Sequence, residues 1–241
     1  MLRLFVSSAQ VDATRVRITG PELRHLRTLR LGPGAPLAIF DDRGREHDVL
    51  LERVTAREAW ATIVATHRPE RDSPLDLVLA PALLKGTKMD LVVEKATELG
   101  VRRIAPVITR YTIARGPHTE RWRRIAVAAA KQSGRTRIPV VDAPVPLRGL
   151  LRAPWPGLRL IAWEGERTRG LAALPATAAA LVMVVGPEGG LATEEIAEAE
   201  ACGFISVRLA PRVLRAETAA LTAVALCQDR WGDLSMAGSL D

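Results

Sequence analysis

The second half of the chain alternates short apolar runs with longer stretches of helical periodicity. Residues 181–185 are apolar and rich in valine, which predicts a short buried strand. A helix is expected to follow, with Thr193 as its N-cap, acidic residues in its first turn and Gly203 at its end. Ile205, Val207 and Leu209 alternate with other residues and predict a further strand. Strands and helices in alternation favour a mainly parallel α/β sheet.

The same alternation begins near residue 75. Strands are expected at 75–80, 104–108, 138–141 and 158–163. A helix capped by Thr87 and ending at Gly100 is expected after the first strand, and a helix over 119–133 after the second. The α/β pattern therefore spans residues 74–241.

The first 70 residues follow a different pattern, in which short strands succeed one another closely. Strands are expected at 2–6, 15–18, 36–40, 47–54 and 60–66, with a short helix from Gly20. Such spacing favours a small β-barrel. Residues 67–74 are charged and contain two prolines, which indicates a linker. We therefore predict two domains, 1–70 and 74–241.

Two irregular loops follow the last two expected strands. The first is Gly-Pro-Glu-Gly-Gly at 186–190, and the second is Ala-Pro-Arg-Val-Leu-Arg at 210–215. Neither the Gly-Lys-Ser/Thr of a phosphate-binding loop nor the G-x-G-x-x-G spacing of a dinucleotide site is present. In open α/β sheets ligands bind at the carboxyl ends of strands, so both loops are candidates for a binding site.

Composition narrows the class of protein. Hydrophobic residues make up 48% of the 241 residues, which suffices for a core, and no apolar run reaches the length of about 20 residues that a membrane span needs. The start of the chain is too short and too soon polar for a secretory signal. Cys202 and Cys227 show no metal-like spacing, and the four histidines are scattered. We expect a cytoplasmic protein without a metal site.

Positive charge is concentrated in the middle of the chain. The net charge is +7, and residues 74–150 alone carry 14 Lys and Arg against 6 Asp and Glu. Between positions 101 and 140 only Glu120 opposes ten basic residues, an excess that indicates an anionic partner such as RNA more than a solvated surface. The ten are Arg102, Arg103, Arg110, Arg115, Arg121, Arg123, Arg124, Lys131, Arg135 and Arg137.

The short helix near the N-terminus carries a second, smaller group of basic residues. Arg24 and Arg27 could form an ordinary solvated face, or they could contact phosphate groups through their planar guanidinium forks. The segment by itself leaves both interpretations open.

Four motifs together resemble the RsmE-type methyltransferases of the SPOUT superfamily. They are VVGPEGG at 184–190, LAPRVLRAETA at 209–219, KGTKMDLVVEKATELGV at 85–101 and KQSGRTRIPVV at 131–141. Members of that family methylate N3 of a uridine in 16S ribosomal RNA. The resemblance covers nearly the whole chain, but Arg110-Tyr111-Thr112 and Ala210 depart from the usual family pattern.

The resemblance implies a SPOUT-type trefoil-knotted α/β methyltransferase domain preceded by a small PUA-like, RNA-binding β-barrel. It also implies S-adenosyl-L-methionine as the cofactor, 16S ribosomal RNA or the small ribosomal subunit as the partner, and a homodimer. RNA contacts are expected from Arg24, Arg27, Arg110, Arg121, Arg124, Arg135 and Arg137.

The two loops supply the expected site residues. By resemblance the cofactor-binding residues are Gly186, Pro187, Glu188, Gly189, Leu209, Pro211, Leu214, Arg215, Ala216 and Thr218. Methyl transfer to uridine N3 requires loss of the N3 proton, so a carboxylate could accept it, or an arginine could stabilise the anion. The candidate catalytic residues are Arg215, Glu217 and Glu188.

Two other functions remain open from the sequence. One is another SPOUT RNA methyltransferase, such as a tRNA ribose 2′-O-methyltransferase, although the barrel-like start and the loop at 213–219 speak against it. The other is a non-catalytic RNA-binding protein, although the retained glycines of residues 186–190 and Arg215 speak against that.

Overall fold

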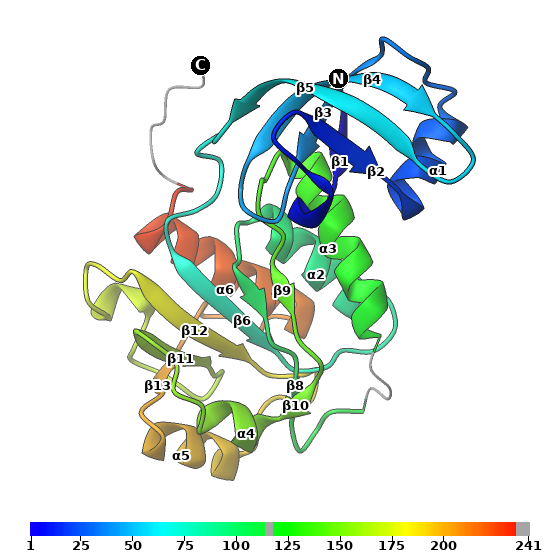
Figure 1. Ribbon diagram of the computed structural model, residues 1–241. Coiled ribbons are helices and arrows are strands. Elements are labelled where there is room, and N and C mark those ends of the chain that lie inside the picture. The colour runs from blue at the N-terminus through cyan, green and yellow to red at the C-terminus, as the bar shows by residue number, and fades with distance from the viewer. Residues whose placement is uncertain (114–117, 235–241) are drawn as a thin grey trace. The chain divides into compact units, whose positions relative to one another are not determined.

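The computed structural model describes residues 1–113 and 118–234 (Figure 1). The chain divides into two compact units. The first contains Met1–Asp72 and Ala130–Ile138, and the second contains Ser73–Ala129 and the described residues from Pro139 onward. The sequence predicts residues 130–138 in the second domain, but the structure groups them with the first unit.

The first unit is built on a mixed β-sheet with the strand order β1-β3-β4-β5-β2 among the described residues. β1 pairs with β3 in parallel, and the remaining pairs are antiparallel. β1 and β2 lie at the two edges of this order, so closure of the sheet into a barrel stays a prediction. The elements are β1 (Leu2–Phe5), β2 (Arg15–Ile18), α1 (Gly20–Thr28), β3 (Pro36–Phe40), β4 (Glu46–Val54) and β5 (Ala59–His67).

The strands and α1 together build the core of the first unit. In β2, Val16 and Ile18 are buried while the two arginines between and before them are exposed. α1 contributes Leu23 and Leu26 to the same core cluster. The strands and the helix that are expected in residues 1–70 are therefore all present.

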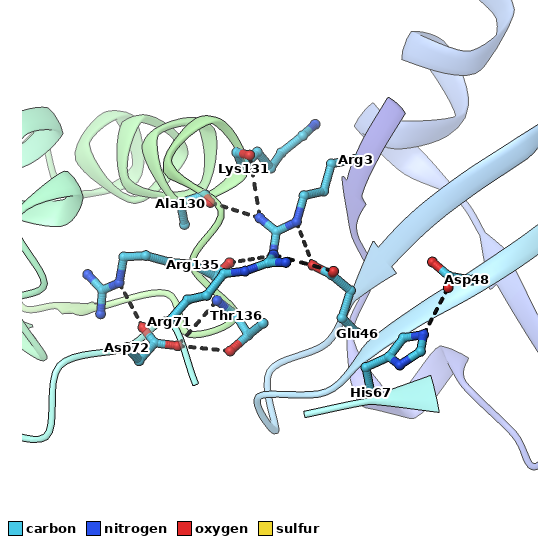
Figure 2. A network of polar contacts seen from close by, with 10 residues as sticks. All are labelled: Arg3, Glu46, Asp48, His67, Arg71, Asp72, Ala130, Lys131, Arg135 and Thr136. Carbon is cyan, nitrogen blue, oxygen red and sulfur yellow. Dashed lines mark hydrogen bonds and ion pairs between the residues drawn. The ribbon is translucent and has the colours of Figure 1, made fainter. Parts of the chain in front are cut away.

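A network of polar contacts attaches residues 130–136 to the sheet of the first unit (Figure 2). The Arg3 guanidinium donates hydrogen bonds to the Glu46 carboxylate at 2.7 Å, to the Ala130 carbonyl at 3.0 Å and to the Arg135 carbonyl at 2.7 Å. The Asp72 carboxylate accepts from Arg135 Nε at 2.8 Å and from the Thr136 hydroxyl at 2.8 Å. These bonds explain why residues 130–138 belong with the first unit.

The second unit contains a parallel sheet with the order β13-β11-β12-β6-β7-β9 among the described strands. This confirms the predicted α/β fold. Its strands are β6 (Asp76–Pro81), β7 (Arg103–Ile104), β9 (Val140–Val141), β11 (Leu158–Ala162), β12 (Ala180–Val185) and β13 (Ile205–Val207); β8 (Val107–Ile108) and β10 (Val145–Pro146) pair separately. The helices are α2 (Lys88–Glu98), α3 (Thr119–Ser133), α4 (Leu147–Leu151), α5 (Thr193–Ala201) and α6 (Ala216–Trp231), and the end of α3 from Ala130 onward belongs to the first unit.

Helices cover both faces of this sheet (Figure 1). On one face Val182 and Val184 of β12 pack in a cluster with Leu150 of α4 and Ile196 of α5. On the other face α6 contacts β6 and β12, and α2 packs against α6. Both faces are covered, so β12 is buried from Leu181 to Val185, as its unbroken apolar run predicts.

Two local expectations are wrong. The strand expected at 104–108 is broken, because Pro106 has no backbone N–H to continue a ladder; β7 stays in the main sheet and β8 pairs with β10. Thr193 is the first residue of α5 and not its cap. The cap position holds Ala192, whose N–H donates to the Glu195 carboxylate at 3.0 Å.

Candidate functional site

The carboxyl ends of β11, β12 and β13 surround a cleft in the second unit. The Trp163 N–H donates to the Val207 carbonyl at 3.0 Å, so the residues after β11 lie beside the end of β13. The cleft contains a narrow cavity of about 80 Å³ and a wider hollow of about 370 Å³. The two share Glu164, Pro187, Gly190, Val213, Leu214 and Ala216 in their walls and therefore adjoin.

The walls of the narrow cavity are largely apolar. Further lining residues come from the end of β11, from the loop after β12 and from the loop after β13. They are Ala162, Trp163, Val185, Gly186, Arg208, Leu209, Ala210, Arg212 and Ala219. Apolar walls with a few polar groups are typical of small-molecule sites.

The glycines of the first loop are required by its geometry. Gly190 has φ = +73°, a left-handed conformation that side chains disfavour, and a Cβ there would lie 2.6 Å from Glu164 Oε1. At Gly186 a Cβ would lie 2.9 Å from Leu191 Cγ. Gly190 therefore lets the loop run beside Glu164, and Gly186 lets the loop fold back close to Leu191.

The wider hollow brings opposite charges together. Lys88, Glu188 and Arg215 all line it. Lys88 Nζ lies 3.0 Å from Glu188 Oε1 and 3.4 Å from Glu217 Oε2. Burial acts to raise the pKa of Glu188, but hydrogen bonds from the backbone and from Lys88 outweigh it and hold that pKa below its usual value. The hydrogen bond to Glu188 in turn raises the pKa of Lys88.

Most of the expected cofactor residues line the cleft. Gly186, Pro187, Leu209, Leu214 and Ala216 lie in the walls of the narrow cavity, and Glu188 and Arg215 lie in those of the wider hollow.

Four expected site residues are outside the walls of these two hollows. Gly189 faces Tyr111, because a Cβ on this glycine would lie 2.9 Å from Tyr111 Cβ. Pro211 offers its carbonyl to Arg208 Nη2 at 2.9 Å, Thr218 is exposed in the first turn of α6, and Glu217 reaches the site only through Lys88.

Sequence reasoning overlooked the third strand end. Trp163 and Glu164 follow β11 directly, and the rule that identified the other two loops applies to this strand too. It also overlooked Gly190, which the double glycine of the loop could have indicated, and Lys88, for which the sequence offers no comparable signal.

The residues expected to contact RNA are mostly exposed. Arg24 and Arg27 on α1 and Arg137 after α3 are exposed. Arg110 pairs with Glu194 at 3.3 Å, Arg121 pairs with Asp90 at 2.6 Å, and Arg124 Nε donates to the Glu120 carbonyl at 3.3 Å. Arg115 lies outside the described residues.

Arg135 differs from the other arginines. Its side chain is only 3% exposed and is bound to Asp72, so the structure supports an internal, structural role in place of the expected phosphate contact. Lys131 is likewise paired with Glu22, at 2.9 Å. The excess of basic residues between 101 and 140 is therefore partly balanced by acidic residues distant in sequence.

The described residues contain no helix long and apolar enough to cross a membrane. Within the same residues there is no group of three or more His, Cys, Asp or Glu side chains placed to hold a metal ion.

Comparison with known proteins identifies the family. The model of the RNA methyltransferase domain family matches residues 71–228, well over half of the chain and the whole of the cleft. The chain belongs to this RNA methyltransferase family. Within the family it resembles ribosomal RNA small subunit methyltransferase E from Synechocystis sp., with 33% identity over 92% of this chain and 76% of the relative. The same enzyme from Mycobacterium bovis is 32% identical over 89% of this chain and 87% of the relative.

Two solved structures are similar to this chain over almost its whole length. A ribosomal RNA small subunit methyltransferase E from Neisseria gonorrhoeae, bound to S-adenosyl methionine, has a TM-score of 0.90 and 33% identity, with 98% of this chain and 100% of that chain covered. A methyltransferase from Legionella pneumophila in complex with the same cofactor has a TM-score of 0.89 and 31% identity, with 97% and 99% covered.

Proposed function

We propose that this protein uses S-adenosylmethionine to methylate N3 of a uridine in 16S ribosomal RNA of the small subunit. The cleft at the carboxyl ends of β11, β12 and β13 carries this proposal, because it joins a narrow apolar cavity to a wider charged hollow. Relatives about one-third identical are named small-subunit ribosomal RNA methyltransferases, and the two similar solved structures described above hold S-adenosylmethionine.

The narrow cavity fits the cofactor by its chemistry. Leu209, Leu214 and Trp163 supply apolar surface of the kind that an adenine ring needs. Glu164 lies in the walls of both hollows and offers a carboxylate to a ligand that carries a positive sulfonium and an ammonium group. The backbone of residues 186–190 and 209–216 would hold the remaining parts of the cofactor.

S-adenosylmethionine supplies an already activated methyl group, so no metal is needed for the transfer. The protein has to orient the uridine and assist loss of the proton on N3. We assign the wider hollow to the uracil ring, because it adjoins the cofactor cavity and carries Arg215 and Glu188.

Arg215 and Glu188 then have different roles. Glu188 is ionised at neutral pH and can accept the N3 proton, but its lowered pKa makes it a weak acceptor. The larger contribution therefore falls to Arg215, whose fixed positive charge stabilises the uridine anion. Glu217 is 14% exposed and does not line the hollow, so we assign it a supporting role behind Glu188 and Arg215.

The finer architecture is part of the same proposal. We assign residues 1–70 to a PUA-like RNA-binding barrel and residues 74–241 to a SPOUT domain whose cofactor loops are knotted. The exposed arginines Arg24, Arg27, Arg110, Arg121, Arg124 and Arg137 would contact ribosomal RNA. We also expect a homodimer that acts in the cytoplasm.

The decisive experiment maps methylated uridines by mass spectrometry in ribosomal RNA from a strain that lacks this protein. Loss of one N3-methyluridine from 16S RNA, restored by the wild-type gene and not by Arg215→Ala, is the expected result. An unchanged 16S RNA together with a lost 2′-O-methyl group in tRNA would favour the other class of SPOUT enzyme. Failure of the purified protein to bind S-adenosylmethionine in calorimetry would favour a non-catalytic RNA-binding protein.

A further inference from the structure

Lys88 connects the two loops of the cleft from a third element. It is the first residue of α2, while Glu188 lies in the loop after β12 and Glu217 in the first turn of α6. Its ammonium is 3.0 Å from the Glu188 carboxylate and 3.4 Å from the Glu217 carboxylate. One cation thus bridges a carboxylate of the loop after β12 and a carboxylate at the start of α6, which directly follows the second loop of the cleft.

Burial makes this bridge more than an ordinary surface ion pair. The side chains of Lys88 and Glu188 are about one-third exposed, and Glu217 is 14% exposed. Glu217 Oε2 is enclosed and forms no hydrogen bond with the described residues, so the nearby ammonium is the charge that compensates it. Removing that cation would leave a mostly buried carboxylate next to a second one, an arrangement that costs free energy.

Lys95 on the same helix shows what an ordinary lysine pair looks like in this protein. It also contacts two carboxylates, at 2.8 Å each, but both belong to its own helix, at Glu94 and Glu98. Its exposed fraction, 39%, is close to the 34% of Lys88. The two lysines therefore differ in their partners: Lys95 pairs within its own helix, whereas Lys88 joins α2 to two other segments.

We propose that Lys88 is a positioning residue, which holds the loop after β12 and the start of α6 at the separation that cofactor binding requires. This inference rests on the proposed function of the cleft. Lys88 acts through Glu188 and Glu217: the ammonium holds the two carboxylates close together, and with them the loop after β12 and the start of α6.

The test compares three variants by calorimetric titration with S-adenosylmethionine. Lys88→Met keeps the length of the side chain and removes the charge, and we expect it to weaken cofactor affinity and to lower kcat/KM by up to about 10²-fold, since misplaced binding groups lose rate on that scale. Lys88→Arg keeps a cation of similar reach and should restore most of the affinity. Lys95→Met is the matched control and should bind like the wild type.

The pH dependence of cofactor binding distinguishes a positioning role from a general loss of stability in the variant. The bridge needs an ionised Glu188, so in the wild type the affinity that the bridge supplies is present above the pKa of Glu188, which Lys88 lowers, and is lost as pH falls through it. Lys88→Met has no ammonium for Glu188 to pair with, so this acidic limb should be absent from its profile. Glu217, Glu164 and Arg215 face the same region and are unchanged in this comparison.

The outcomes separate this inference from the proposed function. If the wild type binds cofactor and Lys88→Met matches it in both affinity and acidic limb, the positioning role is wrong and the methyltransferase proposal stands. If Lys88→Met weakens binding but keeps the acidic limb, and Lys88→Arg fails to restore the affinity, the role through Glu188 is wrong. A wild type that binds no cofactor overturns the proposed function itself.

Discussion

Arg215 ends the second loop of the cleft, at the N-cap position of α6, and lines the wider hollow. Arg215→Ala should therefore lose methyl transfer while the fold is kept. Removing one preorganised charge of this kind costs about 10²–10³-fold in rate. Single-turnover methylation with saturating cofactor and RNA measures the chemical step, and cofactor affinity should change little.

Arg148→Ala is a suitable control for that measurement. Arg148 is 66% exposed on α4 and pairs with Glu198, away from the cleft walls. It should react at the wild-type rate. If Arg215→Ala also reacts at the wild-type rate, Arg215 has no part in the chemical step, and Glu188 is the residue to replace next.

Gly190 is the glycine whose replacement should affect the cofactor most directly. In Gly190→Val the side chain would face Glu164 Oε1 at 2.6 Å from a backbone with φ = +73°. We expect cofactor binding to be abolished, measured by calorimetry. Gly149→Ala is the control, because Gly149 lies in α4 with nothing within 4 Å of the added methyl group. Undiminished binding by the valine variant would place the cofactor elsewhere.

Single residues of the site could be predicted where they belong to a loop that follows a strand. The two loops that contain Gly186, Pro187 and Leu214 were predicted this way, because strand ends and chain breaks are visible in a local pattern, while the individual residues came from the family resemblance. Lys88 could not be found, since its partners lie 100 and 129 positions away and only the tertiary fold brings them together. Arg135 looked like its exposed neighbours in sequence, and only its bond with Asp72 shows that it is internal.

At the scale of secondary-structure elements, periodicity predicts type well and boundaries less well. β12 was predicted because its residues 181–185 are uniformly apolar, and β2 because its polarity alternates. The break between β7 and β8 could have been read from Pro106, whose missing N–H ends the ladder. The start of α5 shifted by one residue because the Glu195 side chain, and not Thr193, binds a free N–H at the helix start.

α3 is the element best suited to an electrostatic test of RNA binding. Replacing Arg121, Arg123 and Arg124 by glutamine should flatten the dependence of log affinity on log salt, by about 0.9 for each phosphate group that is no longer neutralised. Arg121 and Arg123 already pair with Asp90 and Glu120, so Arg124 should account for the largest single share. Filter binding to 16S RNA over a salt series measures this slope.

A change on another helix controls for a general loss of positive charge. Arg148 and Arg152 on and after α4 share Glu198, and their replacement by glutamine removes two charges from a different part of the second unit. This variant should keep the wild-type slope. If the α3 variant also keeps the wild-type slope, the arginines of α3 form a solvated face, which is the alternative interpretation of these basic residues.

At the scale of the whole molecule, the division into two units followed from composition only in part. The linker near residue 70 is visible as a charged segment with prolines. The assignment of residues 130–138 to the first unit depends on Arg3 and Asp72, which are distant in sequence, and no local pattern could reveal it. Long-range hydrogen bonds of this kind mark the limit of prediction from one sequence.

The two units should also respond differently to S-adenosylmethionine. All residues of the cleft belong to the second unit, so bound cofactor stabilises that unit directly. At a concentration 100 times Kd the stabilisation is about 2.7 kcal/mol by mass action, which corresponds to a rise in melting temperature of about 5–10 °C for a unit of this size. Scanning calorimetry over a range of cofactor concentrations should show the rise in the transition of the second unit, and Gly190→Val should abolish it. A rise that persists in this variant, or that is confined to the transition of the first unit, would mean that the cofactor binds outside the cleft.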